Sequence, residues 1–340
     1  MNGLILFVGA LLLLWIGRTI LIPFLAAVFF WYLINAIAAY YRKAMPKNPR
    51  FPRVWNILSG ILAGATLIGV VYLFSTQVRP MFSELMAALP DIQQKLTTFV
   101  DFLSVRLGVA ADTSMLPNIT KIAANLGASA VGMATTVGMV VVYMLFMFVE
   151  QSTFHKKLAA LFPNRTRAKK MRYILGSIDE NMKKYLFMKT LISGATGLMS
   201  YFWLTAIGLP FAGVWAFIIF VANYIPTIGS IVACGLPILY ALVSTDTWNL
   251  PLLVALGLIG LQILFGNIIE PKLTGKTLNL STLAILINLV FWGGLWGVAG
   301  MFFSVPLLVA TFIVMAQFDS TRWIAVLLSA DGKIPNKSDE

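Results

Sequence analysis

Polar side chains interrupt the apolar sequence at two places, and the first is the stretch "NYIPTIGS" at 223–230. It lies between two apolar runs, 211–222 and 231–244, that are each too short to cross a membrane alone. Its polar and helix-breaking members are Asn223, Tyr224, Pro226, Gly229 and Ser230. Proline removes a backbone donor and glycine loosens a helix, so we expect a break here. Broken helices line substrate or ion sites in membrane transporters; the alternative is a tight turn outside the membrane between two tilted helices.

The second interruption is "QILFGNIIEPKLTGK" at 262–276, where a carboxylate ends a long apolar run. Its candidate site residues are Gln262, Asn267, Glu270 and Pro271. Asn267 and Glu270 would project from one face of an α-helix, and Pro271 is expected to stop that helix. If this face lines a cavity, Glu270 is suited to bind and release protons or cations. Alternatively, Glu270 lies at the lipid headgroups, paired with Lys272 or with a nearby basic loop.

Other residues capable of chemistry are few. Lys189 lies inside the apolar run 186–207 and is a further candidate, because a charge within a span costs ~2.5–3.5 kcal/mol on insertion scales. The single cysteine, Cys234, excludes a disulfide framework, and with the single histidine, His155, it gives too few ligands for zinc. Neither has a partner motif for nucleophilic catalysis, and the sequence has no G-x-x-x-x-G-K-[ST] phosphate loop. We therefore expect no enzymatic activity, no cofactor and no metal.

The elements that position these residues follow from composition. Of 340 residues, 59% are hydrophobic and 11% charged, with a mean hydropathy of +0.86, whereas soluble domains have about 45–50% and about 25%. A helix needs ~20 apolar residues to cross the bilayer, and the runs are 3–17, 20–40, 54–74, 130–149, 186–207, 211–222, 231–244, 250–268 and 281–317. Long runs without alternation exclude a barrel. The predicted fold is an all-α polytopic membrane protein with about eight transmembrane helices, some of them broken or re-entrant.

The net charge of +12 is unevenly distributed and predicts the topology. Residues 41–53 hold five Lys/Arg and no acid, and residues 150–185 hold nine Lys/Arg, whereas 75–129 is balanced. An excess of Lys/Arg marks the cytoplasmic side. We therefore place 41–53, 150–185 and both termini in the cytoplasm and 75–129 across the membrane. The same rule explains the basic segments without a nucleic-acid partner.

This topology requires 211–244 and 281–317 each to return to the side from which they entered. The second would turn around "WGGLWG". The sequence leaves open whether each region spans twice or is re-entrant. The predicted segments are 1–74 and 130–149 (transmembrane), 75–129 (extracytoplasmic helical), 150–185 (cytoplasmic basic), 186–317 (transmembrane with breaks) and 318–340 (cytoplasmic tail).

Two segments outside the spans show helical periodicity. Within 75–129, apolar residues alternate by three and four, which is a heptad seam: Phe82, Leu85, Leu89, Ile92, Leu96, Phe99 and Leu103. The seam packs either on the membrane or its own chain, or on a neighbouring subunit. Within 168–189, one face is apolar and the other carries lysines, which indicates an amphipathic helix attracted to anionic lipid.

Several motifs resemble the autoinducer-2 exporter family of bacterial inner-membrane proteins. They are "YLFMKT" at 185–190, "NYIPTIGS" at 223–230, "FGNIIEPKLTGKTLNLST" at 265–282, "FWGGLWGVAGMFFSVPL" at 291–307 and "AVLLS" at 325–329. The similarity covers most of 140–330, and 75–129 carries no such motif. The resemblance implies an inner-membrane exporter of the furanosyl signal autoinducer-2, although some relatives resemble sodium- or potassium-proton antiporters. It also implies a homopentamer, which would give the heptad seam a partner.

The leading hypothesis is a secondary transporter or facilitator that exports a small polar solute. Asn223, Tyr224, Ser230, Gln262, Asn267 and Glu270 would supply its hydrogen-bonding groups. The alternative is a Na+(K+)/H+ antiporter in which Glu270 titrates. A structural or signalling membrane protein is a third class, although a scaffold gains nothing from broken spans. Expected partners are the solute or cation, membrane lipids and further copies of the chain.

Overall fold

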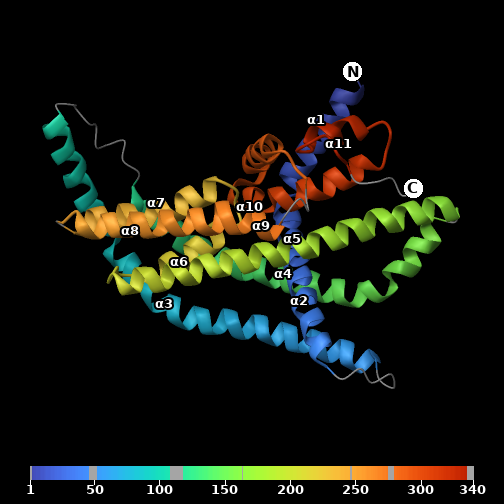
Figure 1. The fold of residues 1–340 in the computed structure, drawn as a ribbon, viewed down its shortest axis with the longest axis horizontal. Coiled ribbons are helices and arrows are strands. Elements are labelled where there is room, and N and C mark those ends of the chain that lie inside the picture. Colours follow the sequence, from blue (N-terminus) through green and yellow to red (C-terminus); the bar gives the residue numbers. More distant parts are fainter. Residues whose placement is uncertain are drawn as a thin grey trace. The chain divides into compact units, whose positions relative to one another are not determined.

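The computed structural model describes residues 2–45, 52–107, 118–162, 164–245, 247–274 and 279–334, and every regular element in these ranges is a helix (Figure 1). The elements are α1 Asn2–Ile16, α2 Arg18–Ala44, α3 Pro52–Leu107, α4 Ile119–Leu161, α5 Arg165–Ala206, α6 Ala212–Ala222, α7 Ile228–Ser244, α8 Asn249–Gln262, the π-helix η2 Ile263–Ile269, α9 Glu270–Thr274, α10 Thr282–Ala316 and α11 Arg322–Leu328. The predicted all-α architecture is confirmed.

Several of these helices are apolar and long enough to cross a membrane. In the described part of the chain, three qualify by length and composition: Arg18–Ala44, Asn249–Leu273 and Thr282–Ala316. Shorter apolar helical stretches are Ile57–Tyr72, Thr135–Gln151, Ala212–Ala222 and Ile228–Ser244. The borders predicted at 74/75, 149/150 and 185/186 fall inside α3, α4 and α5. These segments are therefore successive parts of long helices, and their placement relative to the membrane stays a prediction.

The chain forms two compact units. Unit 1 comprises Met1–Leu67, Thr136–Lys189 and Lys272–Glu340, and unit 2 comprises Ile68–Thr135 and Thr190–Pro271. The stretch 223–230 belongs to unit 2, and so does the second stretch from Gln262 to Pro271, whereas Lys272 begins a part of unit 1. The second half of α5, from Thr190 onward, also belongs to unit 2.

The core of unit 2 gathers side chains from α3, α5, α6, α7 and α8. Leu85 and Leu89 of the heptad seam are buried in it beside Leu204, Trp215 and Leu258. This part of the seam therefore packs on its own chain, as one of the two interpretations predicted. The side chain of Leu103 lies outside the described residues. Contact of the rest of the seam with another subunit stays a prediction.

Glycines allow α5 to approach its neighbours closely. A methyl group added at Gly197 would lie 3.1 Å from the carbonyl oxygen of Ala216, and one at Gly257 would overlap the Trp203 indole at 1.8 Å. Trp203 Nε1 also donates to the Leu253 carbonyl oxygen at 3.2 Å. Lipid is as apolar as leucine, so helices in a membrane associate through such close packing and polar bonds rather than through the hydrophobic effect.

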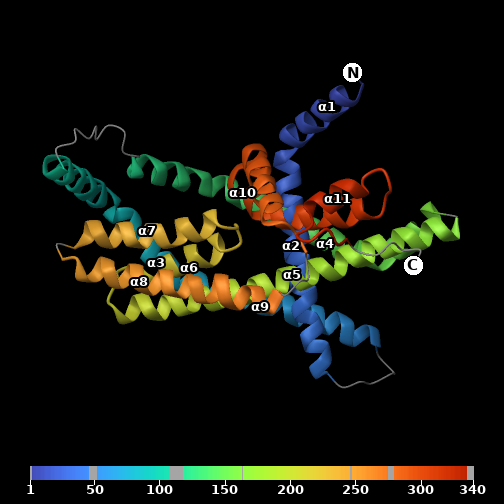
Figure 2. The same ribbon diagram turned by 45° about the horizontal axis from the view of Figure 1, so that its top comes forward.

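The region 211–244 is a helical hairpin, and α6 and α7 lie side by side, joined by a short turn (Figure 2). α6 has 11 residues, which gives ~16 Å of helix against ~30 Å of hydrocarbon. Thr227 has a positive φ of 58°, and a methyl group at Gly229 would lie 1.8 Å from the carbonyl oxygen of Ala222. The predicted break is confirmed, and the short first arm favours the re-entrant alternative.

Unit 1 contains a second hairpin, within α10. Its helix is interrupted at Gly297, which has φ 63° and ψ −142°. Asn288 Nδ2 donates to the Ser304 carbonyl oxygen at 2.6 Å, and a methyl group at Gly300 would lie 1.9 Å from the Trp292 carbonyl oxygen. In both pairs, a residue before Gly297 lies beside a residue after it, so the two arms of α10 pack antiparallel. The predicted hairpin around "WGGLWG" is therefore confirmed.

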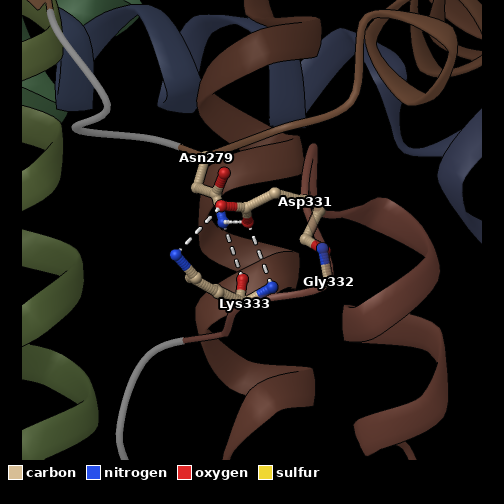
Figure 3. A network of polar contacts seen from close by, with 5 residues as sticks. Asn279, Asp331, Gly332 and Lys333 are labelled. Carbon is tan, nitrogen blue, oxygen red and sulfur yellow. Dashed lines mark hydrogen bonds and ion pairs between the residues drawn. The ribbon is translucent and has the colours of Figure 1, made fainter.

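The C-terminal segment of unit 1 closes onto the residues that precede α10 (Figure 3). Asn279 Nδ2 donates to Asp331 Oδ1 and to the Lys333 carbonyl oxygen, each at 2.7 Å. The Ser281 amide donates to the Leu328 carbonyl oxygen at 2.8 Å. The segment 318–340, predicted as a tail, is therefore folded at least from α11 to Lys333.

Candidate functional site

A buried polar face runs along the second half of α5. Ser193, Thr196 and Ser200 are all buried there. Buried hydroxyls need partners because a lost hydrogen bond is not replaced by water. Thr196 Oγ1 donates to the Ile192 carbonyl oxygen at 2.8 Å, within its own helix. Ser193 is different, since its partner comes from the turn between α6 and α7.

Asn223 and Tyr224 bind this turn to α5. At the end of α6, the backbone N–H of Asn223 donates to the Ile219 carbonyl oxygen. The side-chain Nδ2 of Asn223 donates to Ser193 Oγ at 3.2 Å. Tyr224 OH donates to Thr190 Oγ1 at 2.7 Å. Asn223 is 5% exposed and Tyr224 is 4% exposed. The turn is thus fixed by side-chain hydrogen bonds in an apolar surrounding, where such bonds are strong.

The side chain of Gln262, at the end of α8, is hydrogen-bonded to the side-chain amide of Asn223. Its Nε2 donates to Asn223 Oδ1 at 3.4 Å. Directly after it begins the π-helix η2, in which Gly266 leaves room for the glutamine, since a methyl group there would lie 3.1 Å from Gln262 Nε2. π-helical turns are rare and frequent at functional sites. The predicted residues Asn223, Tyr224 and Gln262 are therefore brought together, and we call them with Thr190 and Ser193 the amide site.

The other predicted residues of the first stretch shape the turn. Gly229 permits the close approach to Ala222, and Pro226 lies half-buried in the turn. Ser230 Oγ donates to the Thr227 carbonyl oxygen at 2.8 Å, in the first turn of α7. Its hydroxyl thus supports the start of α7, and a role toward a solute stays a prediction.

Two expectations about the second stretch are wrong. Asn267 lies in η2 with an exposed side chain, and the Glu270 amide donates to the Phe265 carbonyl oxygen, five residues earlier. A turn closed after five residues does not place residues three apart on one face. Glu270, half-buried, therefore does not share a face with Asn267. Pro271 does not stop the helix, because it occupies the first turn of α9, where proline is tolerated, and the helix continues to Thr274.

Lys189 is buried on α5, one turn before Ser193, and interacts with other groups. Thr190 and Ser193 were not predicted. Serine and threonine in apolar helices commonly bond their own backbone, so their presence alone carries no signal. Their spacing of three residues, directly after a lysine in "MKTLIS", is the pattern that would have shown them.

The amide site contains hydroxyl and amide groups and is formally neutral. Each amide offers both a donor and an acceptor, so the group can exchange its internal bonds for bonds to a small polar solute. Among the residues that the structure describes, no three His, Cys, Asp or Glu side chains gather to hold a metal ion. Four acidic side chains in the described part of the chain form ion pairs with lysines, among them Asp179 with Lys183 at 2.6 Å.

A polytopic helical membrane protein with a buried polar site at a broken hairpin has the architecture of a transporter. The chain belongs to the AI-2E transporter family, whose model matches residues 4–319. It is 32% identical to the AI-2 transport protein TqsA of Escherichia coli K12, over 97% of this chain and 96% of that protein. It is 36% identical to a putative transport protein of Haemophilus influenzae over 58% and 57%. It is 30% identical to a sodium-lithium/proton antiporter of Halobacillus andaensis over 68% and 66%.

Proposed function

We propose that the protein exports a small neutral polar solute, such as autoinducer-2, across the bacterial inner membrane without an ATPase. The observation that carries the proposal is the amide site. Asn223 bridges Ser193 and Gln262 at the end of α6, which covers only about half of the hydrocarbon thickness. A neutral solute loses less hydration free energy there than an ion would.

The similarity to the AI-2 transport protein over nearly the full length of both chains supports autoinducer-2 as the solute. The basic segments 41–53 and 150–185 support cytoplasmic termini. With this orientation, the α6–α7 hairpin enters from the outer side, so its turn points toward the cytoplasm. The amide site would then be the innermost part of a route that opens outward.

The test is flux of autoinducer-2 through purified protein in liposomes. We expect Asn223→Ala and Gln262→Ala to lose most of the flux while the protein still folds and inserts. Asn181→Ala is a matched control, because this half-buried asparagine of α5 donates to the Ser177 carbonyl oxygen within its own helix and lies outside the amide site. Wild-type flux in the Asn223→Ala protein would refute the amide site as the solute site.

A Na+(K+)/H+ antiporter is the second candidate, favoured by the antiporter relative and by the half-buried Glu270 after η2. In that case Glu270 would bind a proton or cation during the cycle. An imposed sodium gradient should then move protons, and Glu270→Gln should abolish that movement. Proton movement that persists in Glu270→Gln excludes Glu270 as the titrating group.

A further inference from the structure

Unit 2 holds a second polar site, at the opposite end of α7 from the amide site. It is an open pocket of about 330 Å³ lined by residues of α3, the α5–α6 loop, the end of α7 and the start of α8. Its polar and aromatic lining includes Asp91, Lys95, Tyr240, Ser244 and Thr245. α7 has 17 residues, so ~25 Å of helix separates this pocket from the turn that carries Asn223. The α3 residues that line it belong to 75–129, the segment predicted to lie outside the cytoplasm.

The charges of the pocket balance each other. Asp91 Oδ2 and Lys95 Nζ lie 3.0 Å apart on consecutive turns of α3, and their side chains are 64% and 48% exposed. An exposed pair of this kind adds little to stability, because water screens it. Both groups therefore retain open hydrogen-bonding positions toward the pocket, one that only accepts and one that only donates.

A fixed aromatic ring forms another part of the pocket. Tyr240 packs against Phe211 at 5.7 Å and Trp215 at 5.5 Å between ring centroids. Trp215 Nε1 donates to the Pro210 carbonyl oxygen at 3.1 Å. Phe211 has a φ of 62°, a left-handed conformation that is rare for an aromatic residue. Such backbone persists only where its surroundings hold it, and it clusters at ligand sites.

We propose that this pocket binds a small neutral polyhydroxylated solute and is the outer binding station of the transport route. Solute hydroxyls would donate to Asp91 and accept from Lys95, with the Tyr240 ring against the apolar side of the solute. For an anion, repulsion by Asp91 offsets attraction to Lys95, and the reverse holds for a cation, so an ion gains little Coulomb energy to compensate for its lost hydration. The pair therefore favours a neutral solute. At about 30 Å³ per water-sized group, the volume accommodates on the order of ten non-hydrogen atoms, the size of a furanose or pyranose.

The proposal rests on the proposed function for its place in a route, but binding can be measured without flux. Purified full-length protein in nanodiscs would be titrated with D-ribose and xylitol as neutral probes, lactate as an anion and putrescine as a cation. Calorimetry reports the affinities. We expect the wild-type protein to bind the two polyols and to discriminate against both ions.

The charge variants provide a signature that a structural role would not produce. Asp91→Asn should weaken polyol binding about tenfold, by loss of a charged acceptor, and should admit lactate. Lys95→Gln should weaken it similarly and admit putrescine. Asp101→Asn is the matched control, because Asp101 is an exposed carboxylate of α3 that does not line the pocket. Its affinities should equal those of the wild type.

Two outcomes overturn the proposal: no polyol binding by the wild type, or the same ion discrimination in Asp91→Asn and Lys95→Gln as in the wild type. Failure of the proposed function is separable. If the charge variants bind as expected but Asn223→Ala still transports, the amide site is wrong and the pocket stands. If Asn223→Ala loses flux and the charge variants bind like the wild type, only the outer station is wrong.

Discussion

The two helical hairpins, α6–α7 and α10, reverse the chain in similar ways but differ at their turns. In each, a glycine lets the backbones of the two arms approach: Gly229 faces Ala222 and Gly300 faces Trp292. At the α10 turn, the residue with positive φ is Gly297, which adopts this conformation at little cost. At the α6–α7 turn it is Thr227, a β-branched residue for which positive φ is strained by ~1–3 kcal/mol. Of these two turns, the one that carries the amide site is therefore the one that retains strain.

The two hairpins also differ in the hydrogen-bond partners of the asparagine that each contains. In α10, Asn288 Nδ2 donates to the Ser304 carbonyl oxygen and Asn288 Oδ1 accepts from Trp292 Nε1 at 3.1 Å, so these bonds stay within one hairpin. In α6–α7, Asn223 is bonded to α5 and α8. A self-contained network stabilises one element, whereas a network shared among three helices changes whenever one of them moves. On the basis of this comparison, we propose that α10 is a structural hairpin and that α6–α7 is the functional one.

The largest expected effect is common to both hairpins. Gly229→Ala and Gly300→Ala would each place a methyl group within 2 Å of a backbone carbonyl oxygen, at 1.8 Å and 1.9 Å. Backbone cannot yield as a flexible side chain can, so we expect each variant to be destabilised by more than ~4 kcal/mol. Thermal unfolding in detergent and the yield of inserted protein measure this. Gly235→Ala and Gly294→Ala are the controls, because nothing lies within 4 Å of their added methyl groups. Normal yields of Gly229→Ala would contradict the close approach.

The second prediction separates the hairpins by function. Asn223→Ala and Asn288→Ala each remove an amide that joins two partners, and each should cost ~1–3 kcal/mol of stability. Only Asn223→Ala should lower flux, because Asn288 is bonded within its own hairpin. Flux per folded molecule in liposomes, normalised by inserted protein, is the measurement. Equal loss of flux in the two variants would remove the distinction between a functional and a structural hairpin.

Much of this comparison could be predicted from the sequence, because glycines interrupt the apolar runs at both turns and Pro226 adds to the interruption at the α6–α7 turn. Composition indicated a membrane protein, and the long apolar runs without alternation indicated an all-α fold. The π-helix could not be predicted, since its five-residue bonding leaves no pattern in side-chain types, and it moved Asn267 away from the face of Glu270. Thr190 and Ser193 lie among ordinary helix residues, and only their spacing after Lys189 could have distinguished them. The pocket at Asp91 and Lys95 depends on segments far apart in sequence, so only the folded chain shows it.

The third prediction tests the strain at the two turns. Thr227→Gly should stabilise the protein by about 1 kcal/mol, because relief of positive φ exceeds the entropy that glycine loses on folding. Gly297→Ala should destabilise the protein by ~1–3 kcal/mol, because the backbone conformation of Gly297, with φ 63° and ψ −142°, is one that residues other than glycine rarely adopt. Chemical unfolding of the purified variants gives both signs. If Thr227→Gly instead destabilises the protein, the threonine side chain contributes more to stability than its positive φ costs.

The smallest effect on stability is expected at Gly266, in η2. A methyl group there would lie 3.1 Å from Gln262 Nε2, a side-chain atom that can shift by a few tenths of an ångström. Alanine also favours a helix over glycine by up to ~1 kcal/mol, so the stability of Gly266→Ala should stay within about 0.5 kcal/mol of the wild type. The shift would nevertheless lengthen the bond from Gln262 to Asn223, which is already 3.4 Å. Flux should therefore fall in a protein of normal stability.

Gly260→Ala, with nothing within 4 Å of its added methyl group, is the matched control in the preceding helix. Normal flux in Gly266→Ala would mean that solute passage does not depend on the contact between α8 and the α6–α7 turn, and the functional hairpin would then act through α5 alone.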